Sequence, residues 1–431
     1  MADSDLEVQA LRTENTQLRR AVDELSILNE LANAIAASRD VEDIIKNITK
    51  RCLSAVRAEQ GVVTLVGQFE SDPTMTLVRT ITGSGEAEAL RPDQSLLGWM
   101  HLNKRPLLIN EPRADDRFRG VKWPDIVRSI LCVPLIAQSR LIGILTLYNK
   151  KRSEAGFTPS DQRLIAILAS QSAQVVEGAR LYEEEKVLLA MRQEVELAHE
   201  IQANLLPSAP PVVPGYEFGG LSVPAKEVGG DYFDYIDMLD GRLGLTVGDV
   251  SGKGVGAALL MASSQATLRG QVVGGDDPAS SLGRTNQLLC QVARKGTFVT
   301  LFLAMLEPAT GLVSYANAGH NKPFVVLADG TIEILTLGGF VLGFLPSFQY
   351  QAAERVLSPG ETLVIYSDGV TEAMNSASEQ FDEERLYTLA KRYHRDGAPA
   401  LVDRILNHVR AFAGEREQSD DITILVVRRP D

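Results

Sequence analysis

Positive charge is in short supply in this 431-residue chain, in which 43 Lys and Arg residues face 56 Asp and Glu residues and give a formal net charge of −13. Nucleic-acid binding requires a surplus of basic residues to displace the counterions of the phosphates, so we expect no nucleic-acid partner. Long apolar runs are also missing, since none reaches the ~20 residues of a membrane-spanning helix. The polar, acidic N-terminus lacks the pattern of a secretory signal. These absences predict a cytoplasmic protein with no membrane partner.

Cysteine is scarce as well. Only Cys52, Cys132 and Cys290 occur, and they lie far apart in the chain. Without a C-x-x-C pair, the usual cysteine pattern of a zinc site is excluded, and so is a disulfide framework. The pattern indicates a reducing compartment. A chain of this length is too long for one hydrophobic core, so we expect two or three domains.

Residues 5–35 carry a heptad repeat. Two sets of residues recur every seven positions: Val8, Asn15, Val22 and Asn29, and Leu11, Leu18, Leu25 and Ala32. Leucine at one core position with asparagine at the other is typical of a parallel dimeric coiled coil, because a buried Asn costs stability but fixes the register. An amphipathic helix packed on its own domain is the alternative. We expect residues 1–32 to form an N-terminal coiled coil and the protein to be a homodimer through its helical segments.

Residues 33–180 alternate between helix-like and strand-like patterns and are expected to form a mixed α/β domain. The segments GWMHLNKRPLLIN, SILCVPL, LIGILTLYN and FTPSDQRLIAILASQ follow one another in this region, and together they resemble a GAF domain. The resemblance implies a sensor domain with an antiparallel sheet flanked by helices. Such domains bind small molecules or serve as dimer contacts. We therefore expect a small-molecule or protein signal here, although no residue selects a ligand.

Residues 181–206 continue the preceding helix as a linker. Five residues keep a seven-residue register and a sixth takes the remaining core position: Leu188, Met191, Val195, Ala198, Leu205 and then Gln202. The linker is either a passive spacer or a second coiled coil that carries a signal, because a rigid helix transmits rotation or bending that a flexible linker cannot. In the second case the regulatory positions are Val195, Ala198 and Gln202. The proline-rich segment PSAPPVVPG ends the helix, so we expect the last domain to cover residues 207–431.

The segment GDVSGKGVGAALLM, residues 248–261, places a lysine among glycines after an apolar strand. Its spacing does not fit a phosphate-binding P-loop, which needs four residues before Gly-Lys and a Ser or Thr after the lysine. Gly252, Gly254 and Ala257 fit the dinucleotide pattern G-x-G-x-x-A, but the carboxylate of Asp249 would repel a pyrophosphate. The segment therefore predicts another use for Asp249.

Four acidic clusters lie in the last domain, and three of them flank apolar, strand-like runs. Their members are Asp231 and Asp234, Asp249, Asp368 and Glu372, and Asp420 and Asp421. If the strands are neighbours, these acids repel one another unless a divalent cation gathers them. Oxygen ligands without His or Cys favour Mg²⁺ or Mn²⁺ over zinc. Two such ions ~4 Å apart turn a shared water into a nucleophile that attacks phosphate esters, so the clusters predict a two-metal site.

The segments PAKEVGGDYFDY, GDVSGKGVGAALLMA, YANAGHNKPFV, LVIYSDGVTEAMN and SDDITILVV resemble the catalytic domain of the SpoIIE/RsbU-type metal-dependent serine/threonine phosphatases of the PPM superfamily. The resemblance implies a β-sandwich with helices on both outer faces and two Mn²⁺ or Mg²⁺ ions at one end of the sheets. It implies metal-binding and catalytic roles for four acids and one carbonyl: Asp231, Asp249, Asp368, Asp420 and the carbonyl of Val250. Asp421 would orient water or a ligand behind them, and Gly252 would allow the tight turn near the substrate.

Two positions depart from the eukaryotic members of this superfamily. Ser251 stands where they have a histidine proposed as a general acid, so the leaving group must be protonated from elsewhere. Lys226 lies near the position of their phosphate-binding arginine and is either a point charge for the phosphate or a strand-edge lysine. We interpret Lys253 as a solvated turn lysine, His320 as a turn-fixing residue and Asp234 as a local hydrogen-bonding residue.

The overall prediction is an α+β multidomain protein with a GAF-type α/β sensor, a helical coiled-coil linker and a PPM-type α-β-β-α sandwich phosphatase. The predicted activity is signal-regulated, metal-dependent hydrolysis of phosphoserine or phosphothreonine. The resemblance implies an anti-sigma-factor antagonist as the phosphorylated protein substrate. The alternative is a non-catalytic dimeric sensor scaffold with a phosphatase-like effector domain, and ligand sensing by the first domain is compatible with either.

Overall fold

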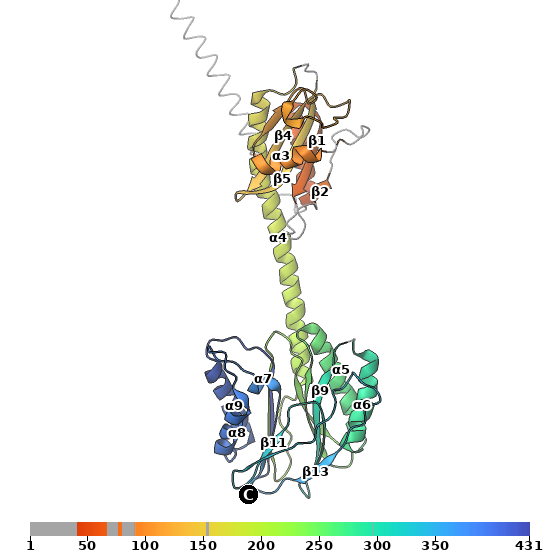
Figure 1. Ribbon diagram of the computed structural model, residues 1–431, viewed down its shortest axis with the longest axis vertical. Coiled ribbons are helices and arrows are strands. Elements are labelled where there is room, and N and C mark those ends of the chain that lie inside the picture. Colours follow the sequence, from red (N-terminus) through yellow and green to blue (C-terminus); the bar gives the residue numbers. More distant parts are fainter. Residues whose placement is uncertain (1–40, 67–75, 80–89, 91, 152–154, 295) are drawn as a thin grey trace, which may run out of the picture. The chain divides into compact units, whose positions relative to one another are not determined.

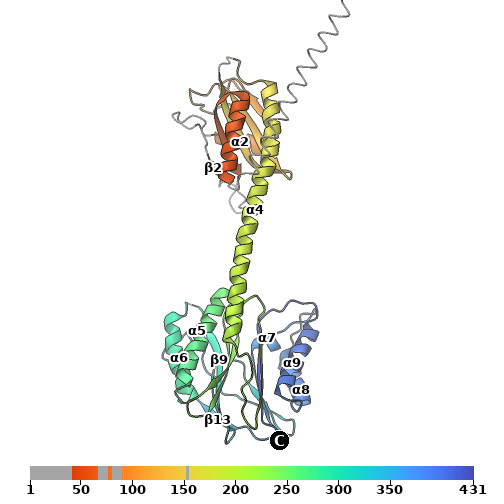
Figure 2. The same ribbon diagram turned by 180° about the vertical axis from the view of Figure 1, so that it is seen from behind.

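The computed structural model describes residues 41–66, 76–79, 90, 92–151, 155–294 and 296–431 (Figure 1, Figure 2). The coiled coil predicted for residues 1–32 lies outside the described residues. The chain divides after Leu189 into two units, and each is described by itself. No described helix is long and apolar enough to cross a bilayer.

The first unit is built on one antiparallel sheet of five strands in the order β2-β1-β5-β4-β3. Its strands are β1 Ala58–Val66, β2 Thr76–Arg79, β3 Leu107–Ile109, β4 Ile130–Ala137 and β5 Arg140–Lys150, and its helices are α2 Val41–Val56, α3 Gln94–Asn103, the short 3-10 helix η1 Asp116–Phe118 and the beginning of α4 Pro159–Leu205. The apolar faces of α2 and α4 pack on one face of the sheet. Helix α3, with Phe118 and Trp123, packs on the other face. The predicted GAF-type α/β domain is confirmed.

The second unit is a sandwich of two five-stranded antiparallel sheets, in the orders β13-β10-β9-β8-β7 and β12-β11-β14-β15-β6. The strands of the first sheet are β7 Tyr232–Asp237, β8 Leu243–Val250, β9 Val299–Glu307, β10 Leu312–Ala318 and β13 Ala353–Val356, and those of the second are β6 Glu217–Val223, β11 Phe324–Val326, β12 Ile332–Ile334, β14 Thr362–Tyr366 and β15 Ile422–Arg428. Apolar side chains such as Phe233, Phe302 and Leu425 fill the space between the sheets.

Helices cover both outer faces of this sandwich (Figure 1). Helices α5 Val255–Val272 and α6 Pro278–Val292 pack on the first sheet, and α7 Asp368–Thr371, α8 Asp382–Tyr393 and α9 Ala398–Ala413 pack on the second. Strands β14 and β15 are mostly apolar along their whole length because they are buried on both faces. The predicted α-β-β-α sandwich is confirmed.

One end of the sandwich collects the ends of four strands. Strand β8 ends with Asp249 and Val250 beside the beginning of β7, with which it pairs antiparallel. Strand β14 ends just before Asp368, beside the beginning of its antiparallel partner β15. The segments that lead into β7 and β15 carry the remaining acids, so pairing brings together residues such as Asp231 and Asp421 that are 190 positions apart. We call Asp231, Asp249, Asp368, Asp420 and Asp421 the acidic edge.

Candidate active site

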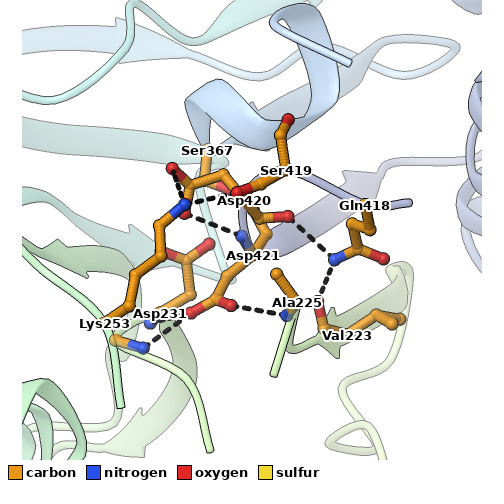
Figure 3. A network of polar contacts seen from close by, with 10 residues as sticks. Val223, Ala225, Asp231, Lys253, Ser367, Gln418, Ser419, Asp420 and Asp421 are labelled. Carbon is orange, nitrogen blue, oxygen red and sulfur yellow. Dashed lines mark hydrogen bonds and ion pairs between the residues drawn. The ribbon is translucent and has the colours of Figure 1, made fainter. Parts of the chain in front are cut away.

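Asp421 holds the loop that carries Asp231 in place (Figure 3). Its Oδ1 accepts a hydrogen bond from the backbone N–H of Ala225 at 2.7 Å, and its Oδ2 accepts from Gly230 at 2.6 Å and Asp231 at 3.3 Å. A Cβ on Gly229 would lie 2.5 Å from Oδ2, so only glycine allows this close approach. Charge-assisted hydrogen bonds to backbone donors are among the strong ones in proteins. Asp421 is therefore a positioning residue for the loop before β7.

Asp231 is buried and only partly satisfied. The residue is only 5% exposed, and the side-chain oxygen Oδ2 has no hydrogen-bond partner among the described residues. Burial, and then the charge of Asp249, raise the pKa of Asp231 well above its usual value. A hydrogen bond with Ser367 lowers this pKa but does not offset the other two effects. A buried carboxylate oxygen without a partner is costly, so this atom requires a ligand or a proton.

Two further carboxyl groups of the acidic edge are perturbed in the same direction. Burial and the charge of Asp368 raise the pKa of Asp249 to about 7. Burial, Asp420 and Glu372 raise the pKa of Asp368. Desolvation and like charges both disfavour the ionised form of a carboxyl group. The acidic edge therefore concentrates negative charge that its surroundings do not fully compensate.

Lys253 supplies one positive charge to this edge (Figure 3). Its Nζ lies 3.0 Å from Oδ2 of Asp420, and it also donates a hydrogen bond to the backbone carbonyl of Ser419. Lys253 is exposed, as the interpretation of a solvated turn lysine expects, but it also pairs with Asp420, which that interpretation does not include. The glycines on either side, Gly252 with φ 98° and Gly254 with φ 83°, adopt left-handed conformations that turn the chain toward Asp420.

The residues after Asp249 meet the backbone of other segments. A Cβ on Gly230 would lie 2.7 Å from the carbonyl oxygen of Val250, so the loop before β7 lies directly against that oxygen. Ser251 is held by Phe298: its N–H donates to the Phe298 carbonyl at 3.0 Å, and its Oγ accepts from the Phe298 N–H at 2.9 Å. Ser251 is therefore engaged with the backbone and is not placed as a substitute for the catalytic histidine.

Among the described residues, the remaining candidates Asp234 and Lys226 form no hydrogen bond or ion pair with the side chains of the acidic edge. Asp234 is fully buried and pairs with Arg269 of α5 through two contacts of 2.5 and 2.6 Å, and it accepts a hydrogen bond from Gln265 at 3.2 Å. Its Oδ1 also accepts the local hydrogen bond from the Tyr235 N–H at 2.9 Å that the sequence interpretation expects, but no sequence pattern indicates its ionic partner Arg269. Lys226 is exposed and forms no ion pair within the described part of the chain.

His320 has the turn-fixing contacts that the sequence suggests. Its backbone N–H donates to Oδ1 of Asn317 at 2.8 Å, and Asn317 Nδ2 donates to its carbonyl at 3.0 Å. The ring Nδ1 lies 2.9 Å from Oγ1 of Thr300. Burial lowers the pKa of His320 to about 4, which leaves the ring neutral at physiological pH.

The end of helix α4 contacts the same loop that Asp421 holds. Gln202 is buried, its Nε2 donates to the Gly229 carbonyl at 2.6 Å, and its Oε1 accepts from the Gly229 N–H at 3.0 Å. At the helix end, Gln265 of α5 donates to the Leu205 carbonyl at 2.8 Å. Val195 and Ala198 are half-buried on the same helix. Of the three candidate linker positions, Gln202 is the one that touches the loop carrying Asp231.

The acidic edge fits divalent cations by the chemistry of its donors. No group of three or more His, Cys, Asp or Glu side chains among the described residues is arranged to hold a metal ion. The donors are nevertheless all oxygens, one of them is the orphaned Oδ2 of Asp231, and three of the carboxyl groups have raised pKa values. Such oxygen donors suit Mg²⁺ or Mn²⁺.

Two helix-covered sheets with carboxylates gathered at one end have the architecture expected of a PPM-type phosphatase domain. Residues 239–430 match the model of the family described as Stage II sporulation protein E (SpoIIE), and residues 38–177 match the GAF domain. The second unit is therefore similar to the SpoIIE family and the first unit to the GAF domain, and both predicted resemblances are confirmed.

Individual relatives agree with this assignment. Protein IcfG of Synechocystis sp. is 29% identical over 266 residues, which are 55% of this chain and 42% of that protein. Phosphoserine phosphatase RsbU of Bacillus subtilis is 28% identical over 253 residues, which are 58% of this chain and 75% of that protein. The solved SiaA-PP2C domain of Pseudomonas aeruginosa has a TM-score of 0.51 and 24% identity, and the match covers 56% of this chain and 98% of that domain. The last likeness concerns the fold, and this chain spans less than half the length of IcfG.

Proposed function

We propose that this protein removes phosphate from phosphoserine or phosphothreonine of a protein substrate, in a reaction that depends on a divalent metal. The observation that carries the proposal is the pair formed by buried Asp231 and half-buried Asp249. Asp231 has an orphaned Oδ2, and each carboxyl group has a raised pKa. Two neighbouring carboxylates that are both withdrawn from water and repel each other favour a cation for compensation. The name of the relative RsbU, a phosphoserine phosphatase, supports the reaction class.

The ions would be Mn²⁺ or Mg²⁺, two per domain, held by Asp231, Asp249, Asp368, Asp420 and the Val250 carbonyl. When bound, such ions supply a water nucleophile at neutral pH and neutralise charge on the phosphate. Asp421 keeps the Asp231 loop in position through its backbone contacts. Lys226, exposed next to Ala225 of that loop, contributes positive charge that attracts the phosphate.

Hydrolysis of p-nitrophenyl phosphate tests this proposal. We expect turnover with Mn²⁺ or Mg²⁺, none with EDTA, and a loss of at least ~100-fold in Asp249→Asn and Asp368→Asn, because each removes a charged ligand. The matched control is Asp403→Asn, the same change at an exposed position of α9. A folded protein that neither turns over the ester nor binds Mn²⁺ would instead support the non-catalytic sensor scaffold.

The substrate class that we propose is a phosphorylated anti-sigma-factor antagonist. This rests on the likeness of the second unit to RsbU and to phosphoserine phosphatase RsbP of Bacillus subtilis, which is 23% identical over 243 residues. Purified phosphorylated antagonist proteins, offered beside unrelated phosphoproteins, test it. Equal rates on both sets would contradict this substrate class.

We also propose that the protein is a homodimer whose GAF domain receives a small-molecule or protein signal, and that helix α4 passes the signal on. Apolar side chains along α4 are exposed, among them Leu188, Met191, Leu197 and Ile201, which supports helix pairing with a second copy. The Gln202–Gly229 contact supports transmission to the Asp231 loop. Light scattering of the full chain tests the dimer, and a monomer at micromolar concentration would contradict it.

A further inference from the structure

A cavity of about 240 Å³ opens beside the acidic edge. Residues after α7, the C-terminal end of α9 and the segment that leads into β15 line it. Two lining residues, Gly369 and Ser419, are the direct chain neighbours of Asp368 and Asp420. The backbone is tightly packed here, since a Cβ on Gly369 would lie 2.0 Å from the carbonyl oxygen of Asp421. An occupant of this cavity therefore lies next to the carboxylates that the proposed reaction uses.

The lining combines an apolar floor with a charged rim of two arginines and Glu417. Ala373, Val409 and Ile422 are buried at the floor, and Met374 and Ala413 are half-buried beside them. Arg416 at the rim is fixed, because its Nη1 donates to the Asn375 carbonyl at 2.9 Å and to Ser378 Oγ at 3.2 Å.

Arg410 is the other arginine of the rim. It is exposed, and no carboxylate within the described ranges forms an ion pair with it. An unpaired guanidinium beside an apolar pocket suits an apolar side chain with an acidic neighbour.

The size of the cavity favours a small occupant. Small-molecule and cofactor sites usually exceed about 300 Å³, whereas this cavity has room for one bulky side chain. We propose that it receives an apolar side chain of the phosphoprotein substrate, close in sequence to the phosphoserine, while Arg410 pairs with an acidic residue of the same segment. The proposal rests on the proposed function and names how its protein substrate is recognised.

A second cavity also adjoins the site and is the main rival. It measures about 380 Å³ and is lined by Ser251, Lys253, Leu259 and Val292 among others. Most of its apolar lining comes from the exposed faces of α5 and α6, where Leu259 is 66% and Val292 is 63% exposed. It offers Lys253 and Arg294 as cations, but Lys253 already pairs with Asp420. We therefore assign the substrate side chain to the smaller cavity. The experiment below also includes a variant that fills the larger cavity.

The experiment compares two synthetic phosphoserine peptides on the full chain with Mn²⁺. One carries Leu and Glu on both sides of the phosphoserine, and the other carries Ala and Gln. We expect kcat/KM to favour the Leu/Glu peptide at least ~10-fold, an energy difference of about 1.4 kcal/mol. Ala413→Trp, which fills the cavity, and Arg410→Glu, which reverses the charge at its rim, should each reduce this ratio to about one.

Matched variants control the comparison. Lys391→Glu makes the same charge change as Arg410→Glu on the exposed surface of α8, and it should keep the ratio of the wild type. Leu259→Trp fills the rival cavity and should keep it too. Because each ratio compares two peptides on one sample, it does not depend on the folded fraction of a variant. The proposal is overturned if the wild-type protein shows no preference for the Leu/Glu peptide. It is also overturned if this preference is lost in Leu259→Trp but kept in Ala413→Trp.

Measurements of peptide binding distinguish failure of the proposed recognition pocket from failure of the proposed phosphatase function. Fluorescence anisotropy with labelled peptides on Asp249→Asn reports recognition without turnover. Turnover of both peptides at equal rates, with equal binding, overturns the pocket and leaves the phosphatase intact. If the protein hydrolyses neither the peptides nor p-nitrophenyl phosphate, the proposed function is overturned. If, in addition, the two peptides bind equally well or do not bind, the proposed recognition pocket is overturned too.

Discussion

The carboxamide of Gln202 and the backbone of Gly229 form hydrogen bonds in both directions, at 2.6 Å and 3.0 Å. The N–H groups of Gly230 and Asp231, the next two residues, donate to the single carboxylate oxygen Oδ2 of Asp421. One short loop thus joins the end of a long helix to the acidic edge. A displacement of Gln202 is expected to move the backbone that carries Asp231.

Replacing Gln202 with Ala should weaken both stability and activity. The buried N–H and C=O of Gly229 lose their partners, and an unsatisfied buried group costs about 1–3 kcal/mol. We expect a melting temperature lower by several °C and reduced Mn²⁺-dependent hydrolysis of p-nitrophenyl phosphate, measured by thermal shift and steady-state kinetics. Gln193→Ala on the exposed face of α4 is the control. If the two variants behave alike, the contact does not couple the helix to the site.

Asp421→Asn should loosen the loop before β7. An Asn side chain places an NH₂ group where one oxygen now accepts backbone N–H groups, so at least one donor is left without an acceptor. We expect a loss of roughly 2–4 kcal/mol in the free energy of unfolding, measured by urea denaturation. Amide hydrogen exchange of Gly230 should also accelerate. Unchanged exchange at Gly230 would show that Asp421 does not hold this segment.

Asp249→Asn should stabilise the metal-free protein at neutral pH. The pKa of Asp249 is raised to about 7 in the folded state, whereas an unfolded Asp titrates near about 4. The folded protein therefore binds the proton more tightly between these values, and its stability falls as pH rises from about 4 to about 7. The variant lacks this loss, which amounts to at most about 4 kcal/mol.

Melting curves in EDTA from pH 5 to pH 8 measure this effect. The difference between Asp249→Asn and wild type should grow with pH and level off above about pH 7. Asp403→Asn should show no such trend. A constant difference across the pH range would contradict the assigned charge crowding.

The ion pair between buried Asp234 and the exposed Arg269 should behave as a structural unit. Removing the guanidinium in Arg269→Met leaves Asp234 buried without its cation, which we expect to cost about 2–4 kcal/mol. The double variant Asp234→Asn with Arg269→Met should recover part of this loss, because no charge then remains buried. Guanidinium denaturation of the four proteins gives the coupling energy. Additive effects would show that the pair does not act as a unit.

Much of this architecture can be predicted from the sequence. Strands β14 and β15 are short, mostly apolar runs with Asp at their ends, and the helix predicted through residue 206 ends at Leu205. Each of these features is local, since it depends on periodicity or on a turn residue beside a strand. The acids at the strand ends are therefore recognisable from their immediate chain neighbours alone.

The partners of these residues cannot be predicted in the same way. Asp421 meets Gly230 across 191 positions, and Gln202 meets Gly229 across 27. Such pairs depend on how sheets and helices stack on one another. Hydrophobic patterns in the sequence do not determine this stacking. The ion pair between Lys253 and Asp420 escapes prediction for the same reason, because glycines on both sides of Lys253 suggest only a solvated turn.

Calorimetric titration of the metal-free protein with Mn²⁺ tests the central claim most directly, because every proposed role at the acidic edge depends on divalent ions. We expect two ions bound per chain, with binding abolished or reduced at least ~10-fold in Asp249→Asn and preserved in Asp403→Asn. A folded wild-type protein that binds no Mn²⁺, or binds it equally well without Asp249, would contradict the account.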